Sequence, residues 1–311
     1  MTIMIEAGME MNKRVMVAFM VTVLIWGSAF PGIKVGLQSF SPEHLALFRM
    51  LIASAALILL SWVRRIELPD IKDVPVILIL GFLGFTVYHT GLSFGEQTVS
   101  AGVSSLLVST TPIFSAILGT VFLKDRLSKI GWIGSFVAFL GVMLISFGTG
   151  SSFSAISIGI VWILIAAVGE SFFFTFETNY IKKYGIIQLN IYTIIAGTIF
   201  MMLFLPGLGT EIREASTSST LSVIYLGLIP TIIPYFSLAY VISKAGAAKA
   251  TSSLYLTPAS ALLISWMWLG EVPTYLSVIG GIFTLVGVGL SAVKGSENDQ
   301  EPVESAKQIS T

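Results

Sequence analysis

The sequence has 311 residues, of which 55% are hydrophobic and 11% are charged, whereas a soluble domain is typically about 25% charged. Its mean hydropathy is +0.90, and 17 Lys and Arg balance 17 Asp and Glu. This composition predicts an all-α integral membrane protein and argues against a nucleic-acid-binding protein, because no net positive charge attracts phosphates. The chain has no cysteine and two histidines, so neither a metal nor a cofactor is expected.

The spacing of charged residues predicts ten membrane-spanning helices. Residues 130–169 contain no Asp, Glu, Lys or Arg, and as one helix they would be about 60 Å long, twice the hydrocarbon core of about 30 Å. The chain must therefore turn back once, and the Gly, Thr and Ser residues at 148–152 are the expected turn. In chain order the helices are expected at 15–37, 43–62, 74–95, 99–122, 129–147, 155–180, 188–206, 218–243, 247–269 and 274–293.

The distribution of Lys and Arg predicts that both termini are cytoplasmic. With the N-terminus inside, 14 of these residues lie on the cytoplasmic side, Arg213 lies on the other side, and Lys34 and Arg49 lie within spans. Such an excess is the positive-inside pattern. We therefore expect a multi-pass chain whose first span is an anchor and not a cleaved signal peptide.

The sequence also contains a weak internal repeat at an offset of 146 residues. The matching pairs are Thr111-Pro112 with Thr257-Pro258, Asp125 with the similar Glu271, Gly134 with Gly280, and Gly141 with Gly287. We expect two five-helix repeats, 13–148 and 155–294, between cytoplasmic tails 1–12 and 295–311. Because five is odd, the repeats would be inverted in the membrane, as in many secondary transporters with a substrate site near the midplane.

Several short motifs resemble the EamA-type family of the drug/metabolite transporter superfamily. They are Trp26-Gly27-Ser28, Arg49 early in the second span, the run 101–107 leading to Pro112, and Leu123-Lys124-Asp125-Arg126 followed by Gly134 and Gly141. The resemblance covers roughly residues 13–294. It implies a ten-helix carrier of the cytoplasmic membrane, usually an exporter of small metabolites, amino acids or toxic compounds. The second half departs from the pattern at residues 169–177, where no Trp-Gly-Ser motif stands.

Two motifs of soluble enzymes are better explained as helix packing. Residues 91–95 fit the Gly-x-Ser-x-Gly pattern, but both histidines precede Ser93 and the segment lies inside a predicted helix. Residues 287–292 mimic a dinucleotide fingerprint without the strand that it requires. The chain is therefore not expected to be an enzyme, and a membrane enzyme built around Glu170 and His89 is the alternative from another class.

Pro112 and Pro258 are expected to kink the fourth and ninth spans. Each removes a backbone donor, so the carbonyls of Val108 and Leu254, four residues earlier, lose their helical partners. Lipid cannot satisfy these carbonyls, whereas a threonine, a water or a cavity can. The two prolines are therefore predicted to border a transport path, with a purely structural kink as the alternative.

Ionisable and aromatic residues inside the spans are the candidates for binding substrate or a coupled ion, because a charge there costs about 2.5–3.5 kcal/mol on insertion scales. These candidates are Glu170, His89, Arg49, Tyr88, Trp26, Tyr235 and Tyr255. Glu170, near the centre of the sixth span, is the first candidate for exchanging a proton or binding an ammonium group. Arg49 could bind a carboxylate or pair with Glu96, and simple packing is the alternative for the aromatic residues.

The sequence therefore predicts a secondary transporter that exports amino acids or related small metabolites by alternating access, in exchange for protons. An uncoupled facilitator or an importer of small metabolites is the alternative within transport. The expected partners are a small-molecule substrate and membrane lipid, without nucleic acid. The chain is expected to act as a monomer or a homodimer.

We predict that position 300 lies on the cytoplasmic side. Because the native chain has no cysteine, Gln300→Cys provides a single thiol for a membrane-impermeant reagent. Labelling is expected only after the membrane has been opened, since the positive-inside pattern keeps this tail in the cytoplasm. Labelling of intact cells from outside would contradict the ten-span topology.

Overall fold

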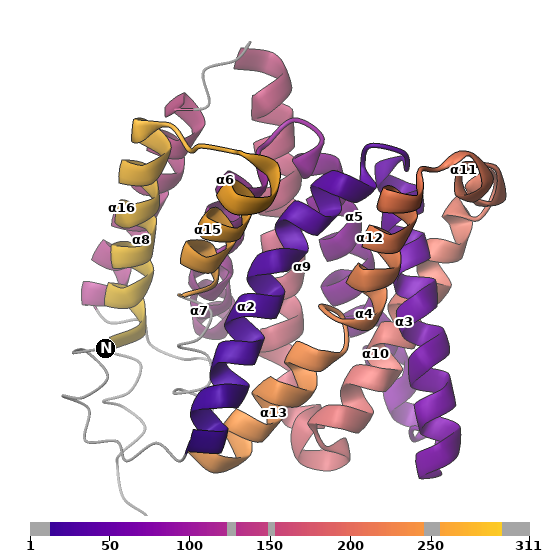
Figure 1. Ribbon diagram of the computed structural model, residues 1–311. Coiled ribbons are helices and arrows are strands. Elements are labelled where there is room, and N and C mark those ends of the chain that lie inside the picture. The colour runs from indigo at the N-terminus through magenta and orange to yellow at the C-terminus, as the bar shows by residue number, and fades with distance from the viewer. Residues whose placement is uncertain (1–12, 123–128, 149–152, 246–255, 294–311) are drawn as a thin grey trace, which may run out of the picture.

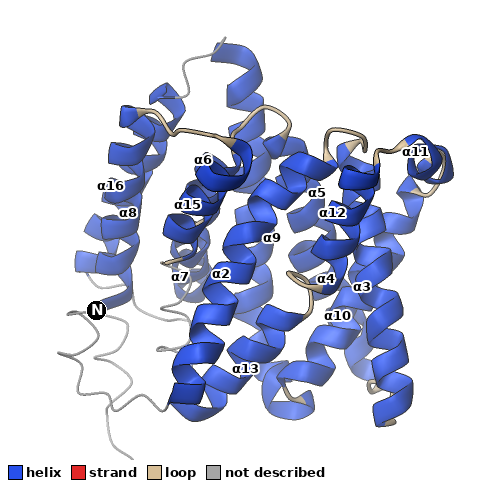
Figure 2. Ribbon diagram, viewed as in Figure 1, coloured by secondary structure: helices blue, strands red, loops and turns tan. Residues whose placement is uncertain are grey.

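A computed structural model describes residues 13–122, 129–148, 153–245 and 256–293, and every regular element in these ranges is helical (Figure 2). Within these ranges, seven helical segments are long and apolar enough to cross a membrane, and three shorter apolar helices accompany them. The long segments are Lys13–Gly36, Pro42–Arg64, Ile71–Glu96, Ala101–Phe122, Ile158–Glu177, Ile186–Phe204 and Thr217–Leu238. The shorter ones are Ile130–Ile145, Thr257–Leu269 and Tyr275–Gly287. Each of the ten expected spans overlaps one of these segments.

The elements form a bundle in which α8 and α16 lie at one side, and α3 and α10 at the other (Figure 1). In chain order they are α2 (Lys13–Gly36), α3 (Pro42–Arg64), η1 (Ile71–Asp73), α4 (Val74–Gly81), η2 (Phe82–Val87), α5 (Tyr88–Glu96), α6 (Ala101–Val108), α7 (Thr111–Phe122), α8 (Lys129–Gly148), α9 (Phe153–Tyr184), α10 (Ile186–Met201), η3 (Met202–Phe204), α11 (Leu208–Glu214), α12 (Thr217–Leu228), α13 (Ile233–Ala245), α15 (Thr257–Leu269) and α16 (Tyr275–Val293).

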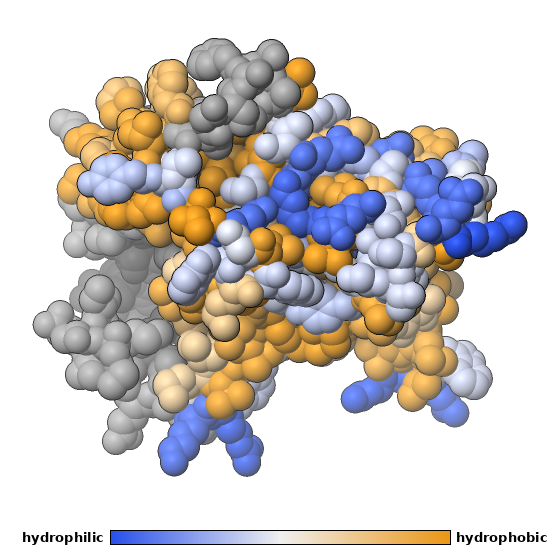
Figure 3. Space-filling view, turned by 45° about the horizontal axis from the view of Figure 1, so that its top comes forward, coloured by the Kyte–Doolittle hydropathy of each residue, from blue (hydrophilic) through white to orange (hydrophobic). Residues whose placement is uncertain are grey.

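The outer surface of the bundle is apolar over most of its height. Large hydrophobic side chains are exposed there, such as Phe136 at 63% and Met267 at 75%. Figure 3 shows hydrophilic side chains gathered on the top face and at the tips of the lower helices, with hydrophobic residues between. An apolar surface of this extent requires lipid or a partner to cover it, which agrees with the membrane-spanning segments.

In the part of the chain that the structure describes, the third, fourth and eighth expected spans depart from the α-helix near their middle. The third span contains a wider π-helical turn, η2, between α4 and α5. The fourth is interrupted at residues 109–110, between α6 and α7, and the eighth at 229–232, between α12 and α13. The interruption in the eighth span was not predicted, and its physical cause is Pro230, which cannot donate to the carbonyl four residues earlier.

The short helix α11 was also not predicted from the sequence. It lies in the connection between α10 and α12, where Glu211 reaches the start of α3. The Glu211 Oε2 atom accepts a hydrogen bond of 3.0 Å from the backbone N–H of Ser41, and Oε1 lies 2.8 Å from Nδ1 of His44. The carboxylate therefore caps α3 from a distant part of the chain, since the first N–H groups of a helix need an acceptor.

Segments that are 146 residues apart make matching contacts. This offset places α2 on α9, α3 on α10, α4 on α12, α5 on α13, α7 on α15 and α8 on α16. Accordingly, α2 packs against α13 and α15, whereas α9 packs against α5 and α7, and the contact of α3 with α12 matches that of α10 with α4. The contacts therefore follow an approximate two-fold symmetry.

The helices α8 and α16 pack so closely that some of their glycines leave no room for a side chain. A Cβ atom on Gly141 would lie 2.5 Å from the carbonyl oxygen of Gly280, and a Cβ atom on Gly287 would lie 2.5 Å from that of Gly134. Residue numbers rise along one helix as they fall along the other, so the two helices are antiparallel. The glycines that match in the sequence repeat therefore lie in the contact between α8 and α16.

We predict that Gly141→Ala destabilises the protein, whereas Gly289→Ala does not. Position 289 has open space around it, and alanine favours a helix over glycine by about 0.5–1 kcal/mol. At position 141 the added methyl group would force α8 and α16 apart, at a cost of about 1–3 kcal/mol. Thermal unfolding in detergent measures both variants, and an unchanged Tm for Gly141→Ala would contradict the close packing.

Candidate functional site

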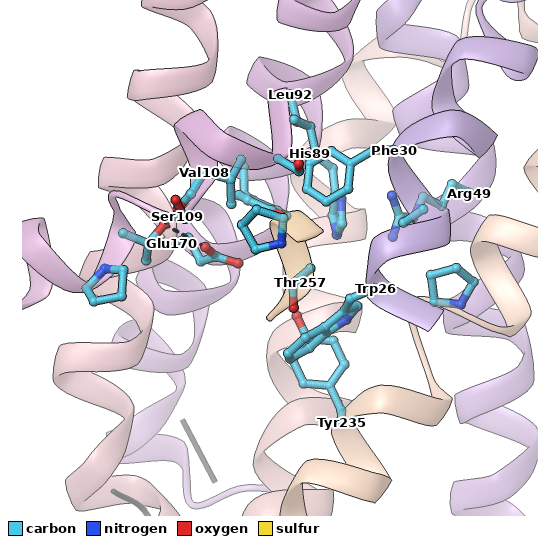
Figure 4. A pocket seen from close by; sticks show the side chains of 17 residues that line it. Trp26, Phe30, Arg49, His89, Leu92, Val108, Ser109, Glu170, Tyr235 and Thr257 are labelled. Atoms are coloured by element: carbon cyan, nitrogen blue, oxygen red, sulfur yellow. Dashed lines mark hydrogen bonds between the residues drawn. The ribbon is translucent and has the colours of Figure 1, made fainter. Parts of the chain in front are cut away.

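A cavity lies where the interrupted helices meet (Figure 4). Its walls come from α2, α3, α5, α6, α9 and α13, from both interruptions, and from the first turns of α7 and α15. The sequence-predicted candidates that line it are Trp26, Arg49, Tyr88, His89, Glu170, Tyr235, Pro112 and Pro258. Tyr255, the remaining candidate, lies outside the described residues. The fold thus brings together side chains from both halves of the chain.

The interruption between α6 and α7 follows from Pro112, which has no N–H to donate to the Val108 carbonyl. The hydroxyl of Thr111 lies 2.8 Å from this carbonyl oxygen and takes the place of the missing donor. The neighbouring hydroxyls of Ser109 and Thr110 donate to the carbonyls of residues 106 and 107, at 2.6 and 2.7 Å. Side-chain hydroxyls therefore satisfy the carbonyls that the interruption exposes.

Glu170 projects from the middle of α9 toward this interruption. Its Oε2 atom lies 2.9 Å from the hydroxyl oxygen of Thr111, so one threonine contacts both the carboxylate and the carbonyl of Val108. Glu170 is partly exposed to the cavity, which leaves the carboxylate accessible to a ligand. Thr111 was not among the predicted site residues. A threonine directly before a proline in mid-span is the signal that could have found it.

The interruption between α12 and α13 has the same chemistry with a basic partner. Pro230 cannot donate to the Leu226 carbonyl, which instead accepts from the backbone N–H of Thr231 at 3.2 Å and from its hydroxyl at 2.8 Å. The Nε–H group of Arg49 donates to the same hydroxyl oxygen at 2.8 Å. Arg49 is 4% exposed, so its guanidinium is held inside the protein by the interrupted eighth span.

The alternative that Arg49 pairs with Glu96 is not realised among the described residues. The ion pairs recorded there do not include these two side chains, and Arg49 bonds to Thr231 instead. Glu96 is fully buried at the end of α5, and neither of its carboxylate oxygens has a hydrogen-bond partner in the described part of the chain. Spacing along the sequence did not reveal that the Arg49 side chain points toward the eighth span.

An acidic and a basic side chain face each other across the cavity. Figure 4 shows Glu170 on one side, Arg49 on the other, and His89 between them. His89 is 4% exposed, and both ring nitrogens lack a partner among the described residues. Since buried polar atoms are normally hydrogen-bonded, His89 can offer a donor and an acceptor to a bound molecule.

Aromatic rings form the wall between the charged groups. Trp26 and Tyr235 contact each other edge to face, with ring centroids 5.6 Å apart, and Tyr88 lies beside His89 with centroids 5.0 Å apart. The cavity therefore combines a basic side chain, an acidic side chain and an amphipathic wall, a pattern suited to a small molecule that carries both charges and an apolar part.

Comparisons with known proteins identify a family of transporters. The model of the EamA-like transporter family matches residues 13–147 and 157–293. The chain is 54% identical to an uncharacterized transporter, YdfC, of Bacillus subtilis (strain 168), over 90% of this chain and 92% of that protein. It is 35% identical to a probable terminal-alkyne amino-acid exporter of Streptantibioticus cattleyicolor, over 91% of this chain and 94% of that protein. A solved crystal structure shares the fold with a TM-score of 0.60 at 15% identity, over 94% of this chain and 99% of that one.

We predict that Thr231→Val lowers the stability of the protein by about 1–3 kcal/mol, because Arg49 loses its buried acceptor and the Leu226 carbonyl loses a donor. Thr231→Ser, which keeps the hydroxyl, should remain close to the wild type. Thr22→Val is the matched control, since the buried Thr22 hydroxyl bonds only to a carbonyl of its own helix, that of Ala18. Equal Tm values for the Val variants at positions 231 and 22 would contradict a special role for the Arg49 contact.

Proposed function

This chain belongs to the EamA-like transporter family, and we propose that it exports amino acids or related small metabolites across the cytoplasmic membrane. The observation that carries the proposal is the cavity with Arg49 at one side and Glu170 at the other. A zwitterionic amino acid has a carboxylate for the guanidinium and an ammonium group for the carboxylate. The relative named as a probable amino-acid exporter supports this substrate class.

The transport cycle that we propose is alternating access between two inverted repeats of five helices. Two copies of the family model, the contacts related by the 146-residue offset, and the antiparallel pair α8 and α16 support this arrangement. With the seven long and three short apolar helices as ten spans, both termini would be cytoplasmic. The halves would then rock about the cavity, exposing it to one side of the membrane at a time.

Each charged residue has a distinct role in the proposed cycle. Arg49 remains protonated in proteins and binds the substrate carboxylate through donors not used by Thr231. Glu170 binds the substrate ammonium in the inward-facing state and a proton in the outward-facing state, because a carboxylate in a low-dielectric cavity needs a counter-charge or neutralisation. One proton would thus enter for each substrate that leaves, so that a proton gradient drives export.

We predict that purified protein is stabilised by amino acids, and not by nucleosides or cationic dyes. A ligand that binds only the folded protein raises the melting temperature, and the rise continues as its concentration exceeds its Kd. The best amino acid is then compared with its methyl ester, which lacks the carboxylate. The wild type should prefer the free acid, and Arg49→Gln should lose this preference, since the guanidinium recognises the carboxylate. Stabilisation by nucleosides or dyes alone would contradict the proposed substrate class.

We predict that Glu170→Gln abolishes gradient-driven export in proteoliposomes but leaves exchange of labelled for unlabelled substrate measurable. Glutamine keeps the shape and an acceptor for the substrate ammonium, but it cannot carry a proton through the cycle. Glu96→Gln is the matched control, because Glu96 is buried but does not line the cavity. Gradient-driven export by Glu170→Gln at the wild-type rate would show that Glu170 is not the coupling group, and His89 would be tested next.

A further inference from the structure

One hydroxyl group in the fourth span has two acceptors within hydrogen-bond distance. The Thr111 Oγ1 atom lies 2.8 Å from the carbonyl oxygen of Val108 and 2.9 Å from Oε2 of Glu170. A threonine hydroxyl carries one proton, so it can donate fully to one of these oxygens at a time. The Val108 carbonyl is also the one that Pro112 leaves without its helical donor.

The charge of Glu170 decides which oxygen receives the Thr111 proton. An ionised carboxylate is an acceptor only, and a hydrogen bond to an ion is stronger than one to a neutral carbonyl. Thr111 then donates to Glu170, and the Val108 carbonyl loses its donor. A protonated Glu170 can instead donate to the Thr111 oxygen, which frees the Thr111 proton for Val108.

The interruption in the eighth span also joins a charged side chain, a threonine hydroxyl and a backbone carbonyl. There the hydrogen bonds between these groups have one fixed direction. Arg49 donates to the Thr231 hydroxyl, which donates to the Leu226 carbonyl, the one left without a helical donor by Pro230. Arginine has donors and no acceptor, so this chain of hydrogen bonds cannot reverse. The fourth span forms a chain of hydrogen bonds in this direction only when Glu170 carries a proton.

We propose that Thr111 is a positioning residue that transmits the protonation state of Glu170 to the interruption between α6 and α7. This inference rests on the proposed function, in which Glu170 exchanges a proton for substrate. With Glu170 protonated, the Val108 carbonyl is satisfied and the interruption is held closed. With Glu170 ionised, the carbonyl is free and residues 109–110 open toward the cavity.

A substrate ammonium and a proton have different effects at this point. An ammonium group neutralises Glu170 but leaves it an acceptor, whereas a proton turns it into a donor. The Val108 carbonyl therefore gains the Thr111 proton in the proton-loaded state and not through the presence of substrate alone. This difference lets the fourth span distinguish the two forms that must face opposite sides of the membrane.

Other titratable groups face Glu170, and their effects on the pH response must be distinguished from the effect of Glu170. Tyr88 on α5, Tyr235 on α13 and Glu177 on α9 interact with it electrostatically, and Arg49 and His89 line the same cavity. Among these groups Glu177 is the second carboxyl. Glu177→Gln and His89→Gln are therefore needed as controls for any response to pH that is assigned to Glu170.

The test is the labelling rate of a thiol placed in the interruption. The thiol is introduced by Ser109→Cys, because Ser109 lines the cavity beside Thr111. The native chain has no cysteine, so this thiol is the single reactive one. The reaction with a small maleimide is followed in substrate-free proteoliposomes from acid to mildly alkaline pH. A thiol at Gln38, exposed between α2 and α3, gives the pH dependence of the reagent itself.

After this correction, labelling of Ser109→Cys should be severalfold slower at acid pH. Thr111→Val, which lacks the hydroxyl, should abolish the difference, and Thr111→Ser should restore it. Thr110→Val is the matched control, because the Thr110 hydroxyl donates to the Leu107 carbonyl and not to Glu170. This control should keep the wild-type response, as should Glu177→Gln and His89→Gln.

Glu170→Gln provides a test that leaves Thr111 unchanged. Its amide always offers a donor, so labelling should stay at the acid limit of the wild type at every pH. A full pH response in Thr111→Val, or its loss in Glu177→Gln with retention in Glu170→Gln, would overturn the proposal. Amino-acid transport is measured separately: a Thr111-dependent response without transport would support the relay and contradict the proposed function.

Discussion

A backbone carbonyl inside a membrane must find a donor within the protein, and this requirement determines where the cavity can lie. Pro112 and Pro230 each remove one donor from a spanning helix, and the hydroxyls of Thr111 and Thr231 replace it. These hydroxyls still have hydrogen-bonding capacity toward the interior. In each case an ionisable side chain from another helix forms a hydrogen bond with this hydroxyl. The hydroxyls that satisfy the interrupted backbone therefore also hold the polar groups of the cavity.

The frame around the cavity depends on close contact between helices. The glycines of α8 and α16 allow the two backbones to come into contact. Close packing of this kind favours helix association in lipid, because burying apolar side chains between helices gives little hydrophobic stabilisation there. Gly27 on α2 has the same role, since a Cβ atom there would collide with Ser260 of α15. Both of these contacts join a helix of the first half of the chain to a helix of the second half.

The sequence predicted the spans and the cavity residues better than their connections. Charges are scarce inside lipid, so their spacing locates helices, and Glu170 or His89 stands out for the same reason. The interruption at Pro230 was missed because residue 84, its counterpart at the repeat offset, is a glycine. Thr111 was missed because hydroxyl residues are common in membrane helices. Its importance comes from the nearness of α9, which is a property of the fold.

The two charged residues of the cavity have no counterparts in the other half. At the same offset, position 195 holds isoleucine where Arg49 stands, and position 24 holds leucine where Glu170 stands. Two identical subunits arranged about a two-fold axis would have to present every charge twice, and a ligand with unlike ends would fit equally well in two opposite orientations. Joining the halves into one chain removes that degeneracy, so an asymmetric molecule in the proposed site would have one preferred orientation.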